Sequence, residues 1–219
     1  MNKNLDWLGH IKVIGWDLDG TLYPSDPRMS EEIVRLRTKR VAEKLEVDES
    51  TAEFLFNKEK RFHSSTTDTL SYIGVSGEEF YVKIWDWLKL EDYIKPDPKV
   101  MEMFGRLRGK RHFLLSNSNT VEQIERKLKL IGVGLEVFEQ MVSTVDVGVN
   151  KPDPKPFNVA LSLMGADVKL EKVLYVGDRV ETDVMGAKAA GLRSCLVGSE
   201  SEEADVCVQR VYDVGDLFK

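Results

Sequence analysis

Two acidic residues separated by one position, Asp17 and Asp19, close a short apolar run in the sequence Val-Ile-Gly-Trp-Asp-Leu-Asp-Gly-Thr. Successive side chains of a strand alternate between its faces, so we expect the two carboxylates to meet at the strand's carboxyl end. Two such charges repel, which raises one pKa unless a cation lies between them. The pair could act as nucleophile and general acid or base, or hold a hard metal ion. A plain strand-to-loop turn is the structural alternative, since Asp-Gly is common in turns.

Three further segments carry residues that could complete such a site. Ser116 and Asn117 follow the run Phe-Leu-Leu, where a hydroxyl and backbone N–H groups would suit a phosphate, although a polar turn that caps the next helix fits as well. Lys151 precedes a proline, which favours an extended backbone, and its compact cation could neutralise phosphate charge. Asp178 follows the run Leu-Tyr-Val-Gly, and Asp183 comes five positions later. Two more acidic groups therefore arrive at the end of a predicted strand.

Short apolar runs that alternate with amphipathic segments indicate the elements that must position these residues. Hydrophobic residues recur at helical spacing over 121–131 and 157–164, and Met101, Phe104 and Leu107 are expected in the core for the same reason. Short strands buried on both faces and separated by helices are typical of an α/β fold with a doubly wound, Rossmann-like parallel sheet. Such sheets bind ligands at the carboxyl ends of their strands. The predicted strands are Ile11–Trp16, His112–Ser116, Gln140–Ser143, Val173–Gly177 and Ser194–Val197.

The interval 24–96 lacks a convincing strand and carries helical patterns instead. We expect one helix that Ser30 opens and that reaches Leu45, a second over Asp48–Arg61 and a third over Ser76–Leu88. The tetrapeptide Lys-Pro-Asp-Pro occurs at 95–98 and again at 151–154, and it is typical of a helix start with Asp as the N-cap. The predicted organisation is a core domain over 1–23 and 97–219 with an inserted all-helical cap domain over 24–96.

The composition limits the classes of function. The 219 residues carry a formal net charge of −6, which argues against binding a nucleic acid polymer, because that needs a basic face. We expect no membrane association, since no apolar stretch is long enough to span a bilayer and residues 1–10 lack a signal-peptide pattern. The two cysteines, Cys195 and Cys207, are expected to be buried thiols in a reducing compartment. These features predict a cytoplasmic protein, and they give no indication of its oligomeric state.

The four motifs together allow a resemblance to be named. The Asp-x-Asp-Gly-Thr sequence, a strand that ends in Ser116, then Lys151, then Gly-Asp with a second Asp at 183, occur in the order found in the haloacid dehalogenase superfamily. The chain is similar to that superfamily from residue 11 to residue 197. Each motif alone is weak or moderate evidence, but four in order make a specific pattern. The resemblance implies a Rossmann-like core and a hydrolase.

The resemblance also implies roles for the motif residues. Asp17 corresponds to the nucleophile, which becomes an aspartyl-phosphate, and Asp19 to the general acid and base. Ser116 and the backbone N–H of Asn117 would bind the phosphoryl oxygens, while Lys151 would offset their charge and position Asp17.

Mg2+ is the cofactor that the resemblance implies. Its ligands would be the carboxylates of Asp17 and Asp178 and the main-chain carbonyl of Asp19. Asp183 would support Lys151 or water at the metal. Without the family, the chemistry is also reasonable, because phosphoryl transfer needs positioning and charge neutralisation, and Mg2+ prefers oxygen ligands.

Several reactions remain possible within this superfamily. Its dehalogenases generally lack an acid at the position of Asp19, because a departing halide needs no proton whereas an alkoxide does. Asp19 therefore favours a Mg2+-dependent phosphatase that acts on a small phosphorylated metabolite. A sugar-phosphate mutase keeps both aspartates and is the alternative. A 2-haloacid dehalogenase or a non-catalytic binding module is less favoured.

The substrate depends on the cap. The run Asp-Gly-Thr-Leu-Tyr-Pro at 19–24 and an all-helical cap resemble the pyrimidine 5′-nucleotidase-like branch, but the run at 62–68 lacks the glycine that this branch often has there. A nucleotide, phosphoglycolate or a sugar phosphate would each be consistent. The candidate substrate-binding residues are Asn117, Thr21, Tyr23 and His63, with a helix-end position for His63 and a hinge position for Tyr23 as the structural alternatives.

Overall fold

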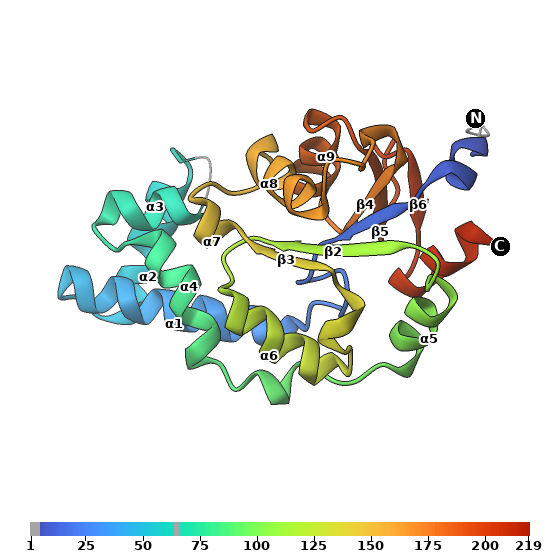
Figure 1. Cartoon of the computed structure of the whole chain (residues 1–219). Coiled ribbons are helices and arrows are strands. Elements are labelled where there is room, and N and C mark those ends of the chain that lie inside the picture. The colour runs from blue at the N-terminus through green and yellow to red at the C-terminus, as the bar shows by residue number, and fades with distance from the viewer. Residues whose placement is uncertain (1–4, 64–65) are drawn as a thin grey trace. The chain divides into compact units, whose positions relative to one another are not determined.

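The computed structural model describes residues 5–63 and 66–219 of the chain. The chain divides into two compact units (Figure 1). Unit 1 comprises Met1–Pro24 and Ile94–Lys219, and unit 2 comprises Ser25–Tyr93. The boundaries lie within three residues of those expected for the core and the insertion. The role of unit 2 as a cap stays a prediction.

Unit 1 contains a six-stranded parallel sheet with the order β3-β2-β1-β4-β5-β6. After β1 the chain adds β2 and β3 on one side of this strand and then β4, β5 and β6 on the other side. The strand order therefore reverses between β1 and β4. In open α/β sheets this point is where the loops leave room for a ligand. The predicted doubly wound fold is confirmed. The strands are β1 Val13–Trp16, β2 Arg111–Ser116, β3 Gln140–Ser143, β4 Val173–Gly177, β5 Arg193–Val197 and β6 Val206–Val208.

The register of the central strands brings the motif residues level with one another. Trp16, the last residue of β1, pairs with Leu114 of β2 and Val176 of β4. The residue that follows β1 is Asp17, and the ends of β2 and β4 lie on either side of it. Three of the four motifs therefore meet at one edge of the sheet.

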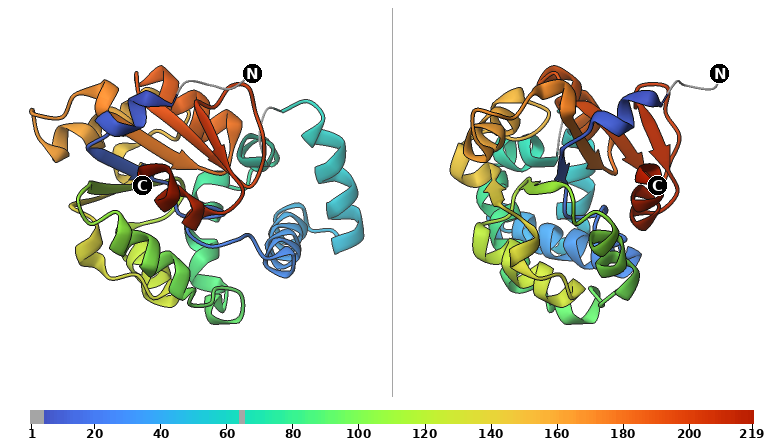
Figure 2. Two further views of the ribbon diagram at one scale, coloured as in Figure 1. Left: turned by 90° about the vertical axis from the view of Figure 1, so that its right-hand side faces the viewer. Right: turned by 45° about the vertical axis from the view of Figure 1, so that its right-hand side comes forward.

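Helices cover both faces of the sheet (Figures 1 and 2). Helices α8 (Pro154–Met164) and α9 (Met185–Ala189) lie on one face, where their apolar residues pack with sheet residues such as Phe113 and Tyr175. Helices α5 (Pro98–Arg106) and α6 (Val121–Ile131) lie on the other face. Met101 was predicted to lie in the core with Phe104 and Leu107, but its side chain is 37% exposed. The buried face of α5 is formed by Val100, Met103 and Phe104, and Met101 lies at the edge of that face.

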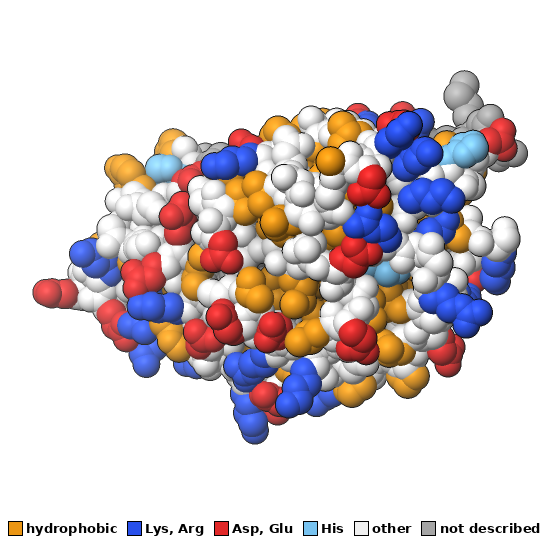
Figure 3. Space-filling view, in the orientation of Figure 1, with side chains coloured by type: hydrophobic (Ala, Val, Ile, Leu, Met, Phe, Trp, Pro, Cys, Tyr) orange, Lys and Arg blue, Asp and Glu red, His pale blue; other side chains and the backbone are white. Residues whose placement is uncertain are grey.

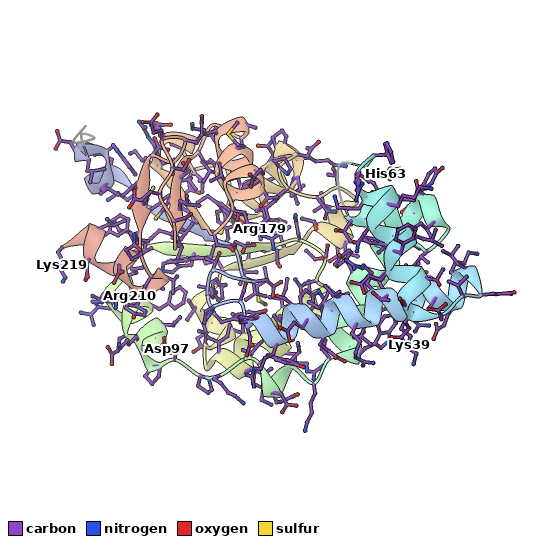
Figure 4. The ribbon with its side chains drawn as sticks, turned by 180° about the vertical axis from the view of Figure 1, so that it is seen from behind. Lys39, His63, Asp97, Arg179, Arg210 and Lys219 are labelled. Carbon is purple, nitrogen blue, oxygen red and sulfur yellow. The ribbon has the colours of Figure 1, made fainter. Side chains whose placement is uncertain are left out.

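Both Lys-Pro-Asp-Pro segments begin helices as predicted. Asp97 precedes α5 and accepts a hydrogen bond from the Lys99 backbone N–H over 3.0 Å (Figure 4). Asp153 precedes α8 and accepts one from Lys155 N over 2.8 Å. Each N-cap accepts a hydrogen bond from a backbone N–H group that has no partner within the helix. Such a cap stabilises the folded protein by about 1 kcal/mol.

Unit 2 consists of helices joined by turns, and no strand occurs among its described residues. Its first helix begins at Pro27 with Asp26 as the N-cap, so the predicted start at Ser30 was wrong. Asp26 followed by proline is the stronger helix-start signal, and it precedes Ser30 in the chain. The helices are α1 Pro27–Leu45, α2 Glu49–Lys60, α3 Thr66–Ile73 and α4 Gly77–Trp87.

The remaining elements are short helical turns. Apart from α7 they are 3-10 turns and one π-helical turn, and no helix among the described residues has both the length and the apolar composition needed to cross a bilayer. Cys195 is buried as expected, whereas Cys207 is only half-buried, and both are free thiols. The turns are Asp6–His10, Leu90–Asp92, Leu135–Val137, α7 Thr144–Val147, Leu170–Lys172, Val180–Val184 and Val211–Phe218.

Acidic and basic side chains are interspersed on the face shown in Figure 3. No continuous basic surface covers this face, in keeping with the formal net charge of −6.

Candidate active site

A buried lysine joins the ends of three strands of the sheet. Lys151 is 4% exposed, and its Nζ atom donates to Asp17 Oδ1 over 2.6 Å and to Asp183 Oδ1 over 2.7 Å. The same atom lies 2.9 Å from the Tyr175 hydroxyl and 3.2 Å from the carbonyl oxygen of Leu115. One ammonium group therefore pairs with two carboxylates. The cluster of Lys151, Asp17 and Asp183 as a whole keeps an excess of negative charge.

Burial and the shared lysine set the proton affinity of Asp17. Burial raises the pKa of Asp17 to about 7, against the opposing attraction of Lys151, and the negative charge of Asp183 adds to the rise. Burial acts to lower the pKa of Lys151, but its two carboxylate partners outweigh burial and hold that pKa well above its usual range. Lys151 is thus a permanent cation at neutral pH, and an additional cation would favour the ionised form of Asp17.

Asp178 is held next to Asp17 by the turn that follows β1. The Thr21 hydroxyl oxygen lies 3.1 Å from Asp17 Oδ2 and 3.4 Å from Asp178 Oδ1, so it connects the two carboxylates. Gly20 has a φ of 89°, and a Cβ atom there would lie 2.4 Å from Asp178 Oδ2. Glycine is required at this turn both for its conformation and for the space that Asp178 occupies.

Three of the described carboxylates could together hold a metal ion. Asp17, Asp178 and Asp183 each offer an oxygen, and these oxygens lie within 4.8 Å of one another. Both Asp183 oxygens already accept hydrogen bonds, one from Lys151 Nζ and one from the Arg179 backbone N–H over 3.0 Å (Figure 4). Both Asp17 oxygens also have partners, Oδ1 in Lys151 Nζ and Oδ2 in the Thr21 hydroxyl, so hydrogen bonding alone does not rank the three carboxylates as ligands. A hard, oxygen-rich set with an excess of negative charge fits Mg2+.

The predicted phosphate-binding residues lie at the end of β2. Ser116 Oγ accepts from Asn119 Nδ2 over 2.8 Å. The side chain of Asn117 is bound to the backbone of Lys151: its Oδ1 accepts from Lys151 N over 3.0 Å, and its Nδ2 donates to Lys151 O over 3.3 Å. Asn117 thus ties the second motif to the third, a role that the sequence did not suggest. The contact of its backbone N–H with a phosphoryl group stays a prediction.

The carboxylate of Asp19 has partners of its own. Lys127 Nζ donates to Asp19 Oδ1 over 2.6 Å, Asn119 Nδ2 donates to Asp19 Oδ2 over 2.7 Å, and the Tyr23 hydroxyl donates to Oδ1. Burial acts to raise the pKa of Asp19, but the charge and hydrogen bond of Lys127 outweigh it, and the net pKa is lowered. In this arrangement Asp19 is ionised at neutral pH, the form that can act as a base.

Two predicted substrate-binding residues can now be placed. Tyr23 is buried, and its hydroxyl lies on Asp19, so it belongs to the site in unit 1. His63 belongs to unit 2, where its ring centroid lies 4.7 Å from that of Tyr72 (Figure 4). Residues 64 and 65 of the run that departs from the nucleotidase pattern lie outside the described residues. Substrate contacts by Thr21, Tyr23 and His63 stay predictions.

Sequence reasoning missed Asn119, Lys127 and Tyr175. A signal for Lys127 was present, because it lies on the apolar side of its helix, three positions after Ile124 and beside Leu128. A charged residue at such a position is buried only when it is paired. Tyr175 is a strand residue whose ring packs in the core while its hydroxyl reaches Lys151.

Comparisons with known proteins agree with this fold. The family model for haloacid dehalogenase-like hydrolases matches residues 11–191. The chain is 33% identical over 201 residues to a glyceraldehyde 3-phosphate phosphatase of Methanopyrus kandleri, covering 83% of this chain and 82% of that protein. The parallel sheet and the four motifs define a class of α/β hydrolytic enzymes in which an aspartate follows the first strand. The chain belongs to the haloacid dehalogenase-like hydrolases.

Other relatives carry different names. A phosphoglycolate phosphatase of Aquifex aeolicus is 27% identical over 217 residues, covering 95% of this chain and 97% of that protein. Pyrimidine 5′-nucleotidase YjjG of Escherichia coli is 29% identical over 126 residues, which covers 57% of this chain and 54% of YjjG.

A solved structure shares the fold over nearly the whole chain. The crystal structure of a phosphatase of the same superfamily from Thermococcus onnurineus matches with a TM-score of 0.68 and 22% identity, covering 94% of this chain and 97% of that one. At this identity the match supports the fold alone.

Proposed function

We propose that this protein is a Mg2+-dependent phosphatase that hydrolyses a small phosphomonoester through an aspartyl-phosphate on Asp17. The observation that carries the proposal is the contact between Asp17 and Lys151, with Asp178 beside them and Asp19 present two residues later. A nucleophilic carboxylate, a fixed cation and a second acid are the groups that cleavage of a phosphate ester needs.

The reaction would proceed in two steps. An oxygen of Asp17 forms a bond to phosphorus, and the bond from phosphorus to the ester oxygen breaks. Asp19, which is ionised in the free protein, first accepts a proton from solvent or from the phosphate monoester and then passes it to the departing alcohol. A water molecule then attacks the phosphorus of the acyl phosphate and gives its proton to Asp19, which releases inorganic phosphate and restores Asp17.

The charged residues around Asp17 would support both steps. Lys151 offsets negative charge on the phosphoryl oxygens and fixes the orientation of Asp17. Ser116 would donate to a phosphoryl oxygen. Asp17 and Asp178 would hold Mg2+, which supplies further neutralisation of the charge on the transferred group.

The substrate class follows from chemistry and from the relatives. Glyceraldehyde 3-phosphate, phosphoglycolate and pyrimidine nucleotides, which appear in the relatives' names, are all small phosphate esters. We assign to unit 2 the role of a cap that selects among such esters, with His63 as its candidate contact. We also retain the prediction of a cytoplasmic protein.

The test is the release of inorganic phosphate from a panel of glyceraldehyde 3-phosphate, phosphoglycolate, phosphoserine, sugar phosphates and nucleoside monophosphates, with and without Mg2+. We expect release that depends on Mg2+ and that falls at least about 10³-fold in Asp17→Asn. Conversion of a sugar phosphate to its isomer without phosphate release would instead identify a mutase. No turnover of any ester would overturn the proposal.

A further inference from the structure

The side chains of Asp19, Lys127 and Asn119 form a closed set of contacts with one another. Lys127 Nζ lies 2.6 Å from Asp19 Oδ1 and 2.6 Å from Asn119 Oδ1, and Asn119 Nδ2 lies 2.7 Å from Asp19 Oδ2. Both oxygens of the Asp19 carboxylate therefore have partners, Lys127 and the Tyr23 hydroxyl at Oδ1 and Asn119 at Oδ2. The three carboxylates that converge elsewhere in the site do not include Asp19.

Stability alone gives little reason for this arrangement. The side chain of Lys127 is 0% exposed, and Asn119 is also fully buried. Taking an ammonium group out of water costs several kcal/mol, and a well-packed apolar side chain in its place is often neutral or stabilising. Apart from Gln123 near its start, the other buried residues of α6 are apolar, namely Ile124, Leu128 and Ile131.

Asn119 also links Asp19 to the end of β2. Its Nδ2 atom lies 2.8 Å from Ser116 Oγ and 2.9 Å from the carbonyl oxygen of Asn117. The backbone carbonyl oxygen of Asn119 accepts a hydrogen bond from Ser143 Oγ over 2.5 Å. The position of the Asp19 carboxylate is thus coupled through one amide group to the loop that would bind phosphate.

We propose that Lys127 and Asn119 are positioning residues that hold the carboxylate of Asp19 in place for proton transfer with the leaving alcohol. This inference rests on the proposed function. It assigns these residues no contact with the substrate. A proton donor contributes only when it is correctly placed, and general acid catalysis is typically worth about 10² to 10⁴ in rate.

The test compares two substrates in the variant Lys127→Met. An alkyl phosphate such as glycerol 3-phosphate releases a poor leaving group that needs the proton, whereas p-nitrophenyl phosphate releases a good one that does not. We expect kcat/KM for the alkyl ester to fall about 10²-fold and kcat/KM for the aryl ester to fall less than about 5-fold. Lys129→Met, on the exposed side of the same helix, is the control and should change neither value.

Two further variants distinguish a loss of positioning from a failure of Lys127→Met to fold. Asn119→Leu keeps the size of the side chain; because Asn119 also contacts Ser116, both esters should lose activity, with the larger loss for the alkyl ester. In an Asp19→Asn background, Lys127→Met should have no additional effect on either ester, because a residue that acts through Asp19 has nothing left to position. Unfolding midpoints are measured for every variant.

The outcomes are distinguishable from those of the proposed function. Hydrolysis of both esters by the wild-type protein supports the proposed function, and hydrolysis of neither overturns that function and this inference together. Given hydrolysis by the wild type, an equal loss on both esters, or a full additional loss in the Asp19→Asn background, overturns the positioning role alone.

Discussion

Lys151 Nζ and Asp17 Oδ1 lie 2.6 Å apart, and both side chains are buried. The two residues come from distant parts of the chain, one after the first strand of the sheet and the other before α8. The second carboxylate on the same nitrogen, Asp183, comes from the turn after β4. A single ammonium group thus holds together the segments that supply the proposed nucleophile and its support.

Lys151→Met should destabilise the protein strongly. Loss of the ammonium leaves two carboxylates buried without their cation, which typically costs about 3–5 kcal/mol in the free energy of unfolding. Urea unfolding at pH 8 without Mg2+ measures this cost. Lys155→Met, at an exposed position in the same segment, should change the free energy by less than about 0.5 kcal/mol. Equal effects of the two variants would show that the buried pair contributes nothing.

Gly20→Ala should harm both stability and the metal site. An alanine at a φ of 89° is strained, and its Cβ atom would lie 2.4 Å from Asp178 Oδ2. The matched control is Gly198→Ala, where φ is 83° but nothing lies within 4 Å of the added atom. Both variants should lose about 1 kcal/mol from the backbone, and only Gly20→Ala should also lose stabilisation by Mg2+. Identical behaviour in thermal unfolding with Mg2+ would contradict the crowding at Asp178.

Mg2+ should stabilise the folded protein in the absence of substrate. Binding to the folded state alone raises the free energy of unfolding by about 2.7 kcal/mol at 100 times the dissociation constant. The unfolding midpoint should rise with MgCl2 at constant ionic strength, and Asp178→Asn should lose most of the rise. Asp146→Asn, an exposed acid of the same unit, should keep it. A rise that survives in Asp178→Asn would place the ion elsewhere.

His112 should make the stability of the protein depend on pH. Its ring is buried, with Nδ1 accepting from Trp16 Nε1 over 3.1 Å and Nε2 lying 3.3 Å from Leu107 O. Burial lowers the pKa of His112 from 6.5 to about 4. Between these values the unfolded chain binds the proton and the folded one does not, so stability falls as the pH falls from 6.5 towards 4.

The loss that His112 causes should amount to about 3 kcal/mol by pH 4. Urea unfolding at pH 7 and pH 4.5 measures it by comparison with His112→Gln, which should lose less stability over the same interval. His10→Gln, at an exposed position, should follow the wild-type curve. A wild-type slope that His112→Gln leaves unchanged would rule out this histidine as its source.

Much of the sheet could be predicted because its strands are uninterrupted apolar runs between helices. The strand β6 escaped because Val206–Val208 is only three residues long and forms the edge of the sheet. The helix α3 escaped because its eight residues include three threonines, which carry a weak helical signal. The local signal was therefore weak in both elements, in β6 because of its length and in α3 because of its helix propensity.

The site was predictable as far as it depends on the ends of strands. Asp17, Ser116 and Asp178 follow or close neighbouring strands, so alternation and sheet order bring them together. Lys127 could not be paired with Asp19 in this way, because its position depends on how α6 packs against the sheet. That packing is tertiary information which no local pattern in the sequence carries.

The order of the strands also has a consequence for synthesis of the chain. β1 emerges first from the ribosome, yet its neighbours begin at Arg111 and Val173. The helices of unit 2, whose contacts are local, can form while β1 still lacks both partners. The nascent chain therefore carries an unpaired apolar strand until β2 has been made, about halfway along these 219 residues, and we expect its yield to depend on chaperones that shield that strand.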